Sequence, residues 1–185
     1  MRKSYVFATF VAMFALAIGA SAQKSANFSG TWVLDKTLSK LGERNNIESQ
    51  TLTVSQTDKD IKVSTSTKRM APPASAPAGG GGGRMGGGGM GAGDMTASYT
   101  FDGKETTVEM DTPRGKVPVN YMGKLDGGKL MLSSSRTMNG PNGEIKMSSK
   151  ETWSLSADGT TLTVESESTG MRGTTSATKV FKKKV

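Results

Sequence analysis

The sequence is patterned as many short strands joined by tight turns, and this restricts its possible folds more than any other feature. Apolar and polar residues alternate over most of its length, and turn pairs such as Asp102-Gly103 and Asp158-Gly159 interrupt the alternation. Alternation with a period of two is typical of half-buried strands, and Asp-Gly pairs are typical of hairpin turns. Helical periodicity is almost absent, apart from one helical turn predicted around Leu38 and Leu41. The pattern predicts ten strands, at residues 30–35, 48–56, 60–68, 96–102, 104–111, 115–125, 129–138, 144–156, 160–169 and 173–182.

The turns also predict the pairing within each hairpin, because the position of a turn sets which residues lie opposite each other. In each predicted hairpin the apolar residues fall on one face of both strands, as a buried face requires. Consecutive hairpins form a meander, and closing it into a barrel removes the exposed edges. We therefore expect an all-β fold, a single antiparallel up-and-down β-barrel of about 8–10 strands. The predicted pairs are Leu155 with Leu162, Trp153 with Val164, Leu125 with Leu130, Tyr121 with Ser134, Val54 with Val63, and Leu52 with Thr65.

The two ends of such a barrel are predicted to differ, because a meander places alternate loops at opposite ends. The end with the tight turns receives apolar inward residues, namely Val54, Val63, Leu125, Leu130, Leu155, Leu162 and Val180. The end with the longer connections receives polar inward residues, namely Thr65, Thr67, Ser134, Arg136, Ser149, Ser166, Ser168, Thr174 and Ser176. One interpretation is an apolar plug beneath a hydroxyl-lined mouth, as a ligand-holding barrel needs. The other is that small Ser and Thr residues lie on solvated strand faces.

The predicted mouth supplies candidate ligand contacts. Arg136 is predicted to face inward opposite Val119, and a buried arginine needs an anionic partner such as a ligand carboxylate or phosphate. Alternatively, its long side chain reaches the solvent at the barrel rim. Glu151 is predicted to face inward opposite Ser166. The full set of candidate contacts is Thr65, Tyr121, Ser134, Arg136, Glu151, Ser166 and Ser176.

The residue types that are missing exclude most catalytic chemistry. The chain has no His and no Cys, so it has no Ser-His-Asp triad, no thiol nucleophile and no ordinary zinc or haem site. A single inward Glu151 lacks the partner that a glycosidase needs. Aromatic residues are too few, and too far from basic ones, for a nucleic-acid stacking surface. We therefore expect a non-enzymatic protein without a catalytic residue, cofactor, metal site or nucleic-acid partner.

The N-terminus has the pattern of a secretory signal. Arg2 and Lys3 precede an apolar run over residues 5–19, and Ala20-Ser21-Ala22 offers a small-x-small cleavage site. The alternative is a retained N-terminal helix. We expect residues 1–22 to be a signal peptide cleaved near Ala22, and residues 23–185 to be one exported barrel domain, periplasmic or extracellular. Without Cys, this domain must hold by packing and β-ladders rather than disulfides.

Residues 69–95 break the strand pattern with a Gly, Pro and Met-rich insertion. Such a composition buries too little apolar surface to offset its chain entropy, so we expect disorder. It is either an idle loop or a flap at the open end of the barrel. Met85, Met90 and Met95, with Met70 upstream, resemble thioether clusters that hold Cu(I), although a site without His or Cys would be weak.

Two short motifs carry a family resemblance. The stretch Phe28-Ser29-Gly30-Thr31-Trp32-Val33-Leu34 resembles the Gly-x-Trp opening strand of lipocalins and the Phe-x-Gly-Thr-Trp opening of intracellular fatty-acid-binding proteins, both of the calycin superfamily. With the stretch from Trp153 to Thr163, the chain is similar to exported bacterial lipocalin-like proteins of unknown function. The resemblance implies structural roles for Gly30, Trp32 and Trp153. It also implies a basic residue of the last strand packed on Trp32, either Lys179 or Arg172. The two-helix lid of fatty-acid-binding proteins and their ligand-binding Arg and Tyr set have no match.

Two functional hypotheses follow. The first is an exported, monomeric lipocalin-like barrel that binds a small amphipathic or anionic ligand. The second is an envelope or matrix interaction protein with a filled barrel. That protein would act through its basic surface, because the formal net charge is +8 and the chain ends in Lys182-Lys183-Lys184. A weak contact with an anionic envelope surface is compatible with either hypothesis.

Overall fold

The computed structural model describes residues 26–42, 45–70, 94–112, 115–140, 143–171 and 173–184, without the side chains of residues 139 and 140. The predicted signal peptide and most of the Gly and Met-rich insertion lie outside these residues. All regular structure in the described part is β-strand, as predicted. The ten strands are β1 (Gly30–Lys40), β2 (Ile47–Gln56), β3 (Asp60–Arg69), β4 (Met95–Thr100), β5 (Thr106–Thr112), β6 (Gly115–Asp126), β7 (Lys129–Gly140), β8 (Gly143–Leu155), β9 (Thr161–Gly170) and β10 (Gly173–Lys183).

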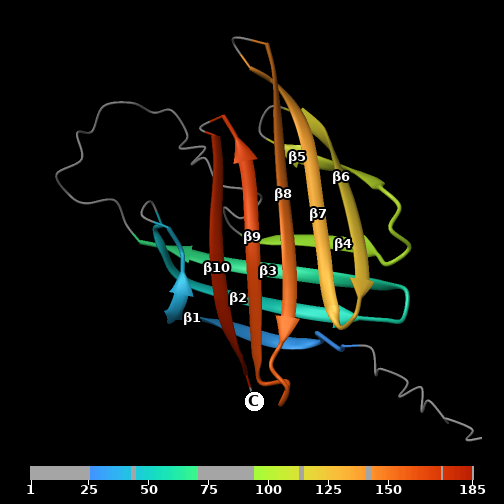
Figure 1. The fold of residues 1–185 in the computed structure, drawn as a ribbon. Helices are drawn as coiled ribbons and strands as arrows, with labels where there is room; N and C mark the ends of the chain where they lie inside the picture. Colours follow the sequence, from blue (N-terminus) through green and yellow to red (C-terminus); the bar gives the residue numbers. More distant parts are fainter. Residues whose placement is uncertain are drawn as a thin grey trace, which may run out of the picture.

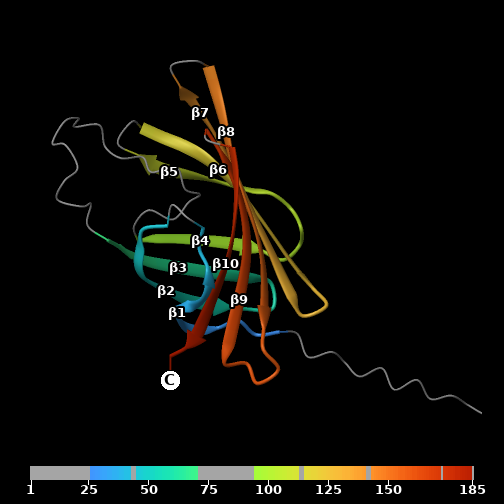
Figure 2. The same ribbon diagram turned by 60° about the vertical axis from the view of Figure 1, so that its left-hand side comes forward.

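The strands form one antiparallel sheet that curls into a nearly closed barrel. Their order in the sheet is β4-β3-β2-β1-β10-β9-β8-β7-β6-β5, so neighbours in sequence are neighbours in space, and β1 also pairs with β10. The strands β1 to β4 run across the direction of β7 to β10, which gives the sheet two facing halves (Figure 1; Figure 2). This arrangement confirms the predicted up-and-down fold.

The predicted strand registers are also confirmed. All six predicted pairs occur, in the hairpins β2–β3, β6–β7 and β8–β9. Arg136 lies opposite Val119 and Glu151 lies opposite Ser166, as expected. The hydrophobic pattern and the turn positions together are enough to set these registers, because a slip of one residue would move every apolar side chain to the outer face.

The strands β4 and β5 are the two edge strands of the sheet. The barrel closes between them by close packing rather than by a ladder of hydrogen bonds. A Cβ atom at Gly123 of β6 would lie 2.8 Å from the carbonyl oxygen of Thr100 and 2.9 Å from Cβ of Tyr99. The amide of Gly103 also donates a hydrogen bond to the carbonyl of Gly123, at 3.3 Å. Only glycine allows β6 to approach the end of β4 this closely.

The first strand is longer than predicted, and the expected helical turn around Leu38 and Leu41 is wrong. The carboxylate of Asp35 accepts hydrogen bonds from the amide and hydroxyl of Thr37, at 3.0 and 2.6 Å. The hydroxyl of Ser39 then donates to the carbonyl of Asp35 and accepts from the amide of Val180, at 2.6 and 2.8 Å. These side chains bridge an irregularity in the ladder, so β1 continues to Lys40.

A packed core fills the end of the barrel that carries the turns β2–β3, β6–β7 and β8–β9, called here the closed end. Its largest fully buried side chains include Trp32, Trp153, Phe28 and Phe181. The rings of Phe28 and Trp153 meet edge to face with centroids 6.1 Å apart. The indole of Trp32 donates a hydrogen bond to the carbonyl of Phe28 at 2.9 Å. This core has the apolar character that was predicted for the closed end.

The cation expected on Trp32 is present but belongs to a different residue. Lys183, rather than Lys179 or Arg172, lies over the indole with its ammonium 5.3 Å from the ring centroid. The reason is the register, in which Trp32 pairs with Lys183. Gly30 has a φ of 137°, and a Cβ there would lie 2.9 Å from Cε of Lys183, so the glycine makes room for this lysine. Arg172 lies outside the described residues.

No helix in the described part of the chain is long and apolar enough to cross a membrane.

Candidate functional site

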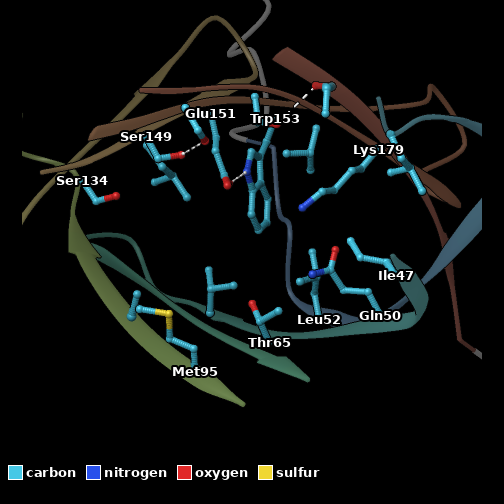
Figure 3. A pocket seen from close by; sticks show the side chains of 18 of the residues that line it. Ile47, Gln50, Leu52, Thr65, Met95, Ser134, Ser149, Glu151, Trp153 and Lys179 are labelled. Atoms are coloured by element: carbon cyan, nitrogen blue, oxygen red, sulfur yellow. Dashed lines mark hydrogen bonds between the residues drawn. The ribbon is translucent and has the colours of Figure 1, made fainter. Parts of the chain in front are cut away.

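A cavity of about 490 Å³ occupies the other end of the barrel, called here the open end. Its floor is the apolar core, with Leu52, Trp153, Val164 and Phe181 among the lining residues. Figure 3 shows the side chains that surround it, with Lys179 and Gln50 reaching in from one side and Met95 and Ser134 on the other. The cavity shows that the barrel is not filled to its end, so the filled-barrel part of the second hypothesis is wrong.

Most of the predicted contacts surround this cavity. Thr65, Tyr121, Ser134, Glu151 and Ser166 line it. They come from β3, β6, β7, β8 and β9, and the confirmed registers turn each of them inward. Five separate strands therefore bring these side chains around one space.

The predicted phase of the last strand is wrong by one residue. Phe181 is buried and lies opposite Leu162, so the odd-numbered residues of β10 face inward. Val180 and Thr174, predicted to face inward, lie on the outer face. Ser176 borders the cavity, but it pairs with the exposed Glu167, so its side chain also belongs to the outer face. Two adjacent apolar residues, Val180 and Phe181, make the alternation ambiguous at this point of the sequence.

Arg136, the predicted anion-binding residue, faces inward but does not line the cavity. It lies further toward the rim, between Val119 of β6 and Met147 of β8. Its Nη2 donates to the sulfur of Met147 at 3.8 Å, and its Nε is buried without a hydrogen-bond partner among the described residues. Arg136 still acts on the cavity wall, because its positive charge opposes the effect of burial, which raises the pKa of the lining residue Tyr121.

The cation that does line the cavity is Lys179, which the corrected phase of β10 turns inward. Its ammonium lies inside the cavity in Figure 3. Burial lowers the pKa of Lys179 below its usual value, while the negative charge of Glu151 acts in the opposite direction. No carboxylate among the described residues forms a salt bridge with Lys179. The cavity therefore holds a cation without a direct ionic partner in that part of the chain.

Glu151 is held in place by the core below it. One carboxylate oxygen accepts a hydrogen bond from the indole nitrogen of Trp153 at 2.8 Å. This bond fixes the carboxylate against the wall of β8 and satisfies the indole donor, which a buried Trp needs. Next to Glu151, the hydroxyls of Ser149 and Ser168 lie 3.2 Å apart and link β8 to β9. The wall formed by β8 and β9 is therefore polar and ordered.

Two phenols complete the polar lining. Tyr99 of β4 and Tyr121 of β6 meet edge to face with ring centroids 5.2 Å apart. Burial raises the pKa of both hydroxyl groups, and the negative charge of Glu151 adds to the effect on the pKa of Tyr99. Both phenols therefore stay protonated at neutral pH and keep a hydroxyl that can donate a hydrogen bond. The aromatic pair also covers the place where β4 and β6 approach each other.

Gln50 of β2 is the most buried polar residue of the lining, with 3% of its surface exposed. Its Nε2 donates to the hydroxyl of Thr67 at 2.9 Å. Its Oε1 is buried and has no hydrogen-bond partner among the described residues. A buried acceptor without a partner is rare and calls for a donor in the cavity.

The sequence-based prediction missed Lys179, Gln50 and Tyr99 as lining residues. The sequence features that could have revealed them differ between the three. Phe181 carries more apolar surface than Val180, which favours the phase that turns Lys179 inward. Gln50 lies two residues before Leu52, and Tyr99 alternates with polar residues on its strand, so the period-two pattern could have found both. Gln50 is polar and Tyr99 lies close to the insertion, so neither stands out as an inward residue from apolar alternation alone.

The described residues contain no group of three His, Cys, Asp or Glu that could hold a metal ion. Of the Met residues proposed for copper, Met95 lies on β4 and lines the cavity. Met85 and Met90 lie outside the described residues.

Comparisons with known proteins give limited similarity. No protein-family model and no curated protein sequence matches the chain. Among solved structures, the zebrafish ileal bile acid-binding protein in complex with cholic acid aligns over 85% of this chain and 98% of its own, with 17% identity and a TM-score of 0.47. Secretory abundant heat soluble protein 4 from Ramazzottius varieornatus aligns over 85% of this chain and 95% of its own, with 15% identity and a TM-score of 0.46. At this level of similarity, neither protein indicates what this chain binds.

Proposed function

We propose that this chain is an exported, non-enzymatic binding protein that takes a small amphipathic anion into the open end of its barrel. The observation that carries the proposal is Lys179. Its ammonium lies inside the cavity without a salt bridge to any described carboxylate. A desolvated charge is costly unless an opposite charge approaches it, and a ligand carboxylate, sulfate or phosphate would supply that charge.

The other charged groups of the lining also favour a negatively charged ligand. Arg69 lines the mouth and donates a hydrogen bond to Asn46. Its charge lowers the pKa of Lys179, although burial lowers it more. Glu151 is the only carboxylate among the described lining residues, and it already accepts from Trp153. Two cations therefore face one engaged carboxylate, so an anion is favoured over a cation.

The distribution of apolar surface makes the ligand amphipathic. The floor beneath Lys179 consists of Leu52, Trp153, Val164 and Phe181. An alkyl or ring system placed on this floor would lose its contact with water at a gain of about 25 cal/mol for each Å² buried. Thr65, Ser134 and Ser166 would contact the polar parts of the ligand, in the roles proposed for them from the sequence.

Binding of decanoate tests the proposal, with 1-decanol as its uncharged analogue. Isothermal titration should show that Lys179→Met weakens decanoate binding about tenfold or more, the range of a charge-assisted hydrogen bond. The same variant should change decanol binding little. Lys182→Met is the matched control, because Lys182 is exposed on the outer face, where its ammonium donates to Thr161.

Raised salt separates this proposal from binding by the basic surface. A surface contact should be lost as ionic strength rises, whereas binding in the cavity should persist. Equal decanoate affinity in Lys179→Met and the unmodified protein would overturn the proposal. For the export part, the mass of the protein recovered from its own compartment should correspond to cleavage near Ala22, and a full-length mass would contradict it.

A further inference from the structure

We infer that the cavity accepts an amphipathic acid that also carries a hydroxyl group near its carboxylate, and that Gln50 Oε1 accepts the hydrogen bond from that hydroxyl. This inference rests on the proposed function and adds a second polar contact to it. It narrows the ligand class from amphipathic anions in general to hydroxylated ones.

The orientation of the Gln50 amide is set by its neighbour across the β2–β3 ladder. Gln50 lies opposite Thr67, and its Nε2 donates to the Thr67 hydroxyl at 2.9 Å. That bond leaves Oε1 as the free end of the amide. Oε1 is buried and has no partner among the described residues. A buried carbonyl oxygen without a donor is destabilising, so the site gains from a ligand that provides the donor.

The free oxygen belongs to the cavity rather than to the packed core. Gln50 is among the lining residues, and Figure 3 shows its amide directed into the same space as the ammonium of Lys179. The phenols of Tyr99 and Tyr121 also line the cavity, yet they supply no hydrogen bond to Oε1. A carboxylate cannot serve Gln50, because a carboxylate only accepts hydrogen bonds at neutral pH. A hydroxyl group close to the carboxylate supplies the missing donor without adding a second charge to the ligand.

The position of Gln50 and Lys179 above the apolar floor indicates how far this hydroxyl lies from the ligand charge. Leu52 and Phe181 both belong to that floor. Gln50 is the next inward residue of β2 from Leu52 toward the open end, and Lys179 is the next inward residue of β10 from Phe181 toward the same end. Since both side chains bend into the cavity, the hydroxyl is expected within a few carbons of the carboxylate.

Titration with decanoate and with each enantiomer of 3-hydroxydecanoate tests the inference. One enantiomer should bind the unmodified protein about 3- to 10-fold more tightly than decanoate, which is the worth of one neutral hydrogen bond. Gln50→Leu should abolish this preference and keep the affinity for decanoate. The control Ser149→Ala also removes a polar group from the lining, but it should keep the preference.

A second variant keeps the inference testable if Gln50→Leu does not fold. Thr67→Val leaves Gln50 in place and removes the hydroxyl that orients its amide, so the preference should fall. The inference is overturned if decanoate and both hydroxy acids bind equally, or if Gln50→Leu keeps the preference. If none of the three acids binds the unmodified protein, the proposed function fails, and the inference fails with it. The two failures are therefore distinguishable.

Discussion

The closed and open ends of this barrel are built from the same ten strands, yet one end is solid and the other is hollow. At the closed end, Trp32, Phe28 and Phe181 are completely or almost completely buried and pack against each other. At the open end, the inward positions of the same strands carry Ser149, Ser166 and other short polar side chains that leave a cavity. The backbone pattern is continuous from one end to the other.

The difference shows that stability and binding are separated along the strand axis. Large apolar side chains fill the closed end, and their burial supplies most of the free energy that holds the barrel together. Short hydroxyl side chains at the open end cannot fill the space between the two sheet halves, and they leave room for a ligand. Changes at the closed end should therefore alter folding, and changes at the open end should alter binding.

The largest effect should come from shortening an aromatic residue at the closed end. Phe181→Ala should lower the free energy of unfolding by about 3–5 kcal/mol, since it leaves a cavity in the core. Thr175→Ala, on the same inward face of β10 but at the open end, should stay within about 0.5 kcal/mol. Urea unfolding followed by circular dichroism measures both, and equal losses would contradict the division between the two ends.

The next effect concerns the closure of the barrel at Gly123. Gly123→Ala would drive a methyl group into the carbonyl oxygen of Thr100, which lies 2.8 Å from the position that this carbon would take. Overpacking of this kind costs about 1–3 kcal/mol. Gly170→Ala is the control, because its nearest neighbour is the flexible end of Met147 at 3.6 Å. A Gly123→Ala variant as stable as Gly170→Ala would show that β6 does not close tightly on β4.

Lys179 should make stability depend on pH at the open end. Its pKa is lowered in the folded protein, so between that pKa and the ordinary value of 10.5 the unfolded chain binds more protons than the folded one. Stability should therefore rise with pH across this window. Above about pH 10 the raised pKa values of Tyr99 and Tyr121 act in the opposite direction.

Lys179→Met should remove the rise, and the variant should be at least as stable as the unmodified protein at neutral pH. Unfolding in urea from pH 7 to pH 10 measures the effect. A rise that persists in Lys179→Met would assign the dependence to another group.

The smallest effect is expected at a turn of the closed end. Asp158 accepts hydrogen bonds from Ser156 and Thr160, which lower its pKa to about 2. Its contribution is fully present above the ordinary value of 3.8 and is lost as pH falls toward 2. Asp158→Asn should make the melting temperature depend less on pH in this range. If the slope between pH 2 and pH 4 is unchanged, the turn carboxylate does not contribute to it.

The sequence predicted the fold better than it predicted the site. Strand positions, hairpin registers and the contrast between the ends follow from period-two alternation and turn chemistry, and both act locally. The phase of β10 is set by its regular pairing with β9, in which Phe181 lies opposite the buried Leu162. In the sequence, the adjacent apolar residues Val180 and Phe181 fit either phase, so alternation alone does not decide between them.

The shifted phase explains the errors at the site. It placed Ser176 inward in place of Ala177, and it left Lys179 out of the predicted lining. Arg136 was predicted to face inward opposite Val119 and does so, but it lies toward the rim and is not among the residues that line the cavity. The choice between Arg136 and Lys179 as the anion-binding residue therefore needed the three-dimensional structure.

The most direct test of the proposed site is the pKa of Lys179 with and without decanoate, measured by NMR from the ε-methylene shifts of the lysines. The pKa of Lys179 is expected to lie below the ordinary value of 10.5 in the free protein and to rise when decanoate binds, because a carboxylate favours the charged amine. The signal assigned by its loss in Lys179→Met should respond, and that of Lys182 should not. An ordinary pKa in the free protein, or one that decanoate leaves unchanged, would contradict the claim that the open end binds an anion at Lys179.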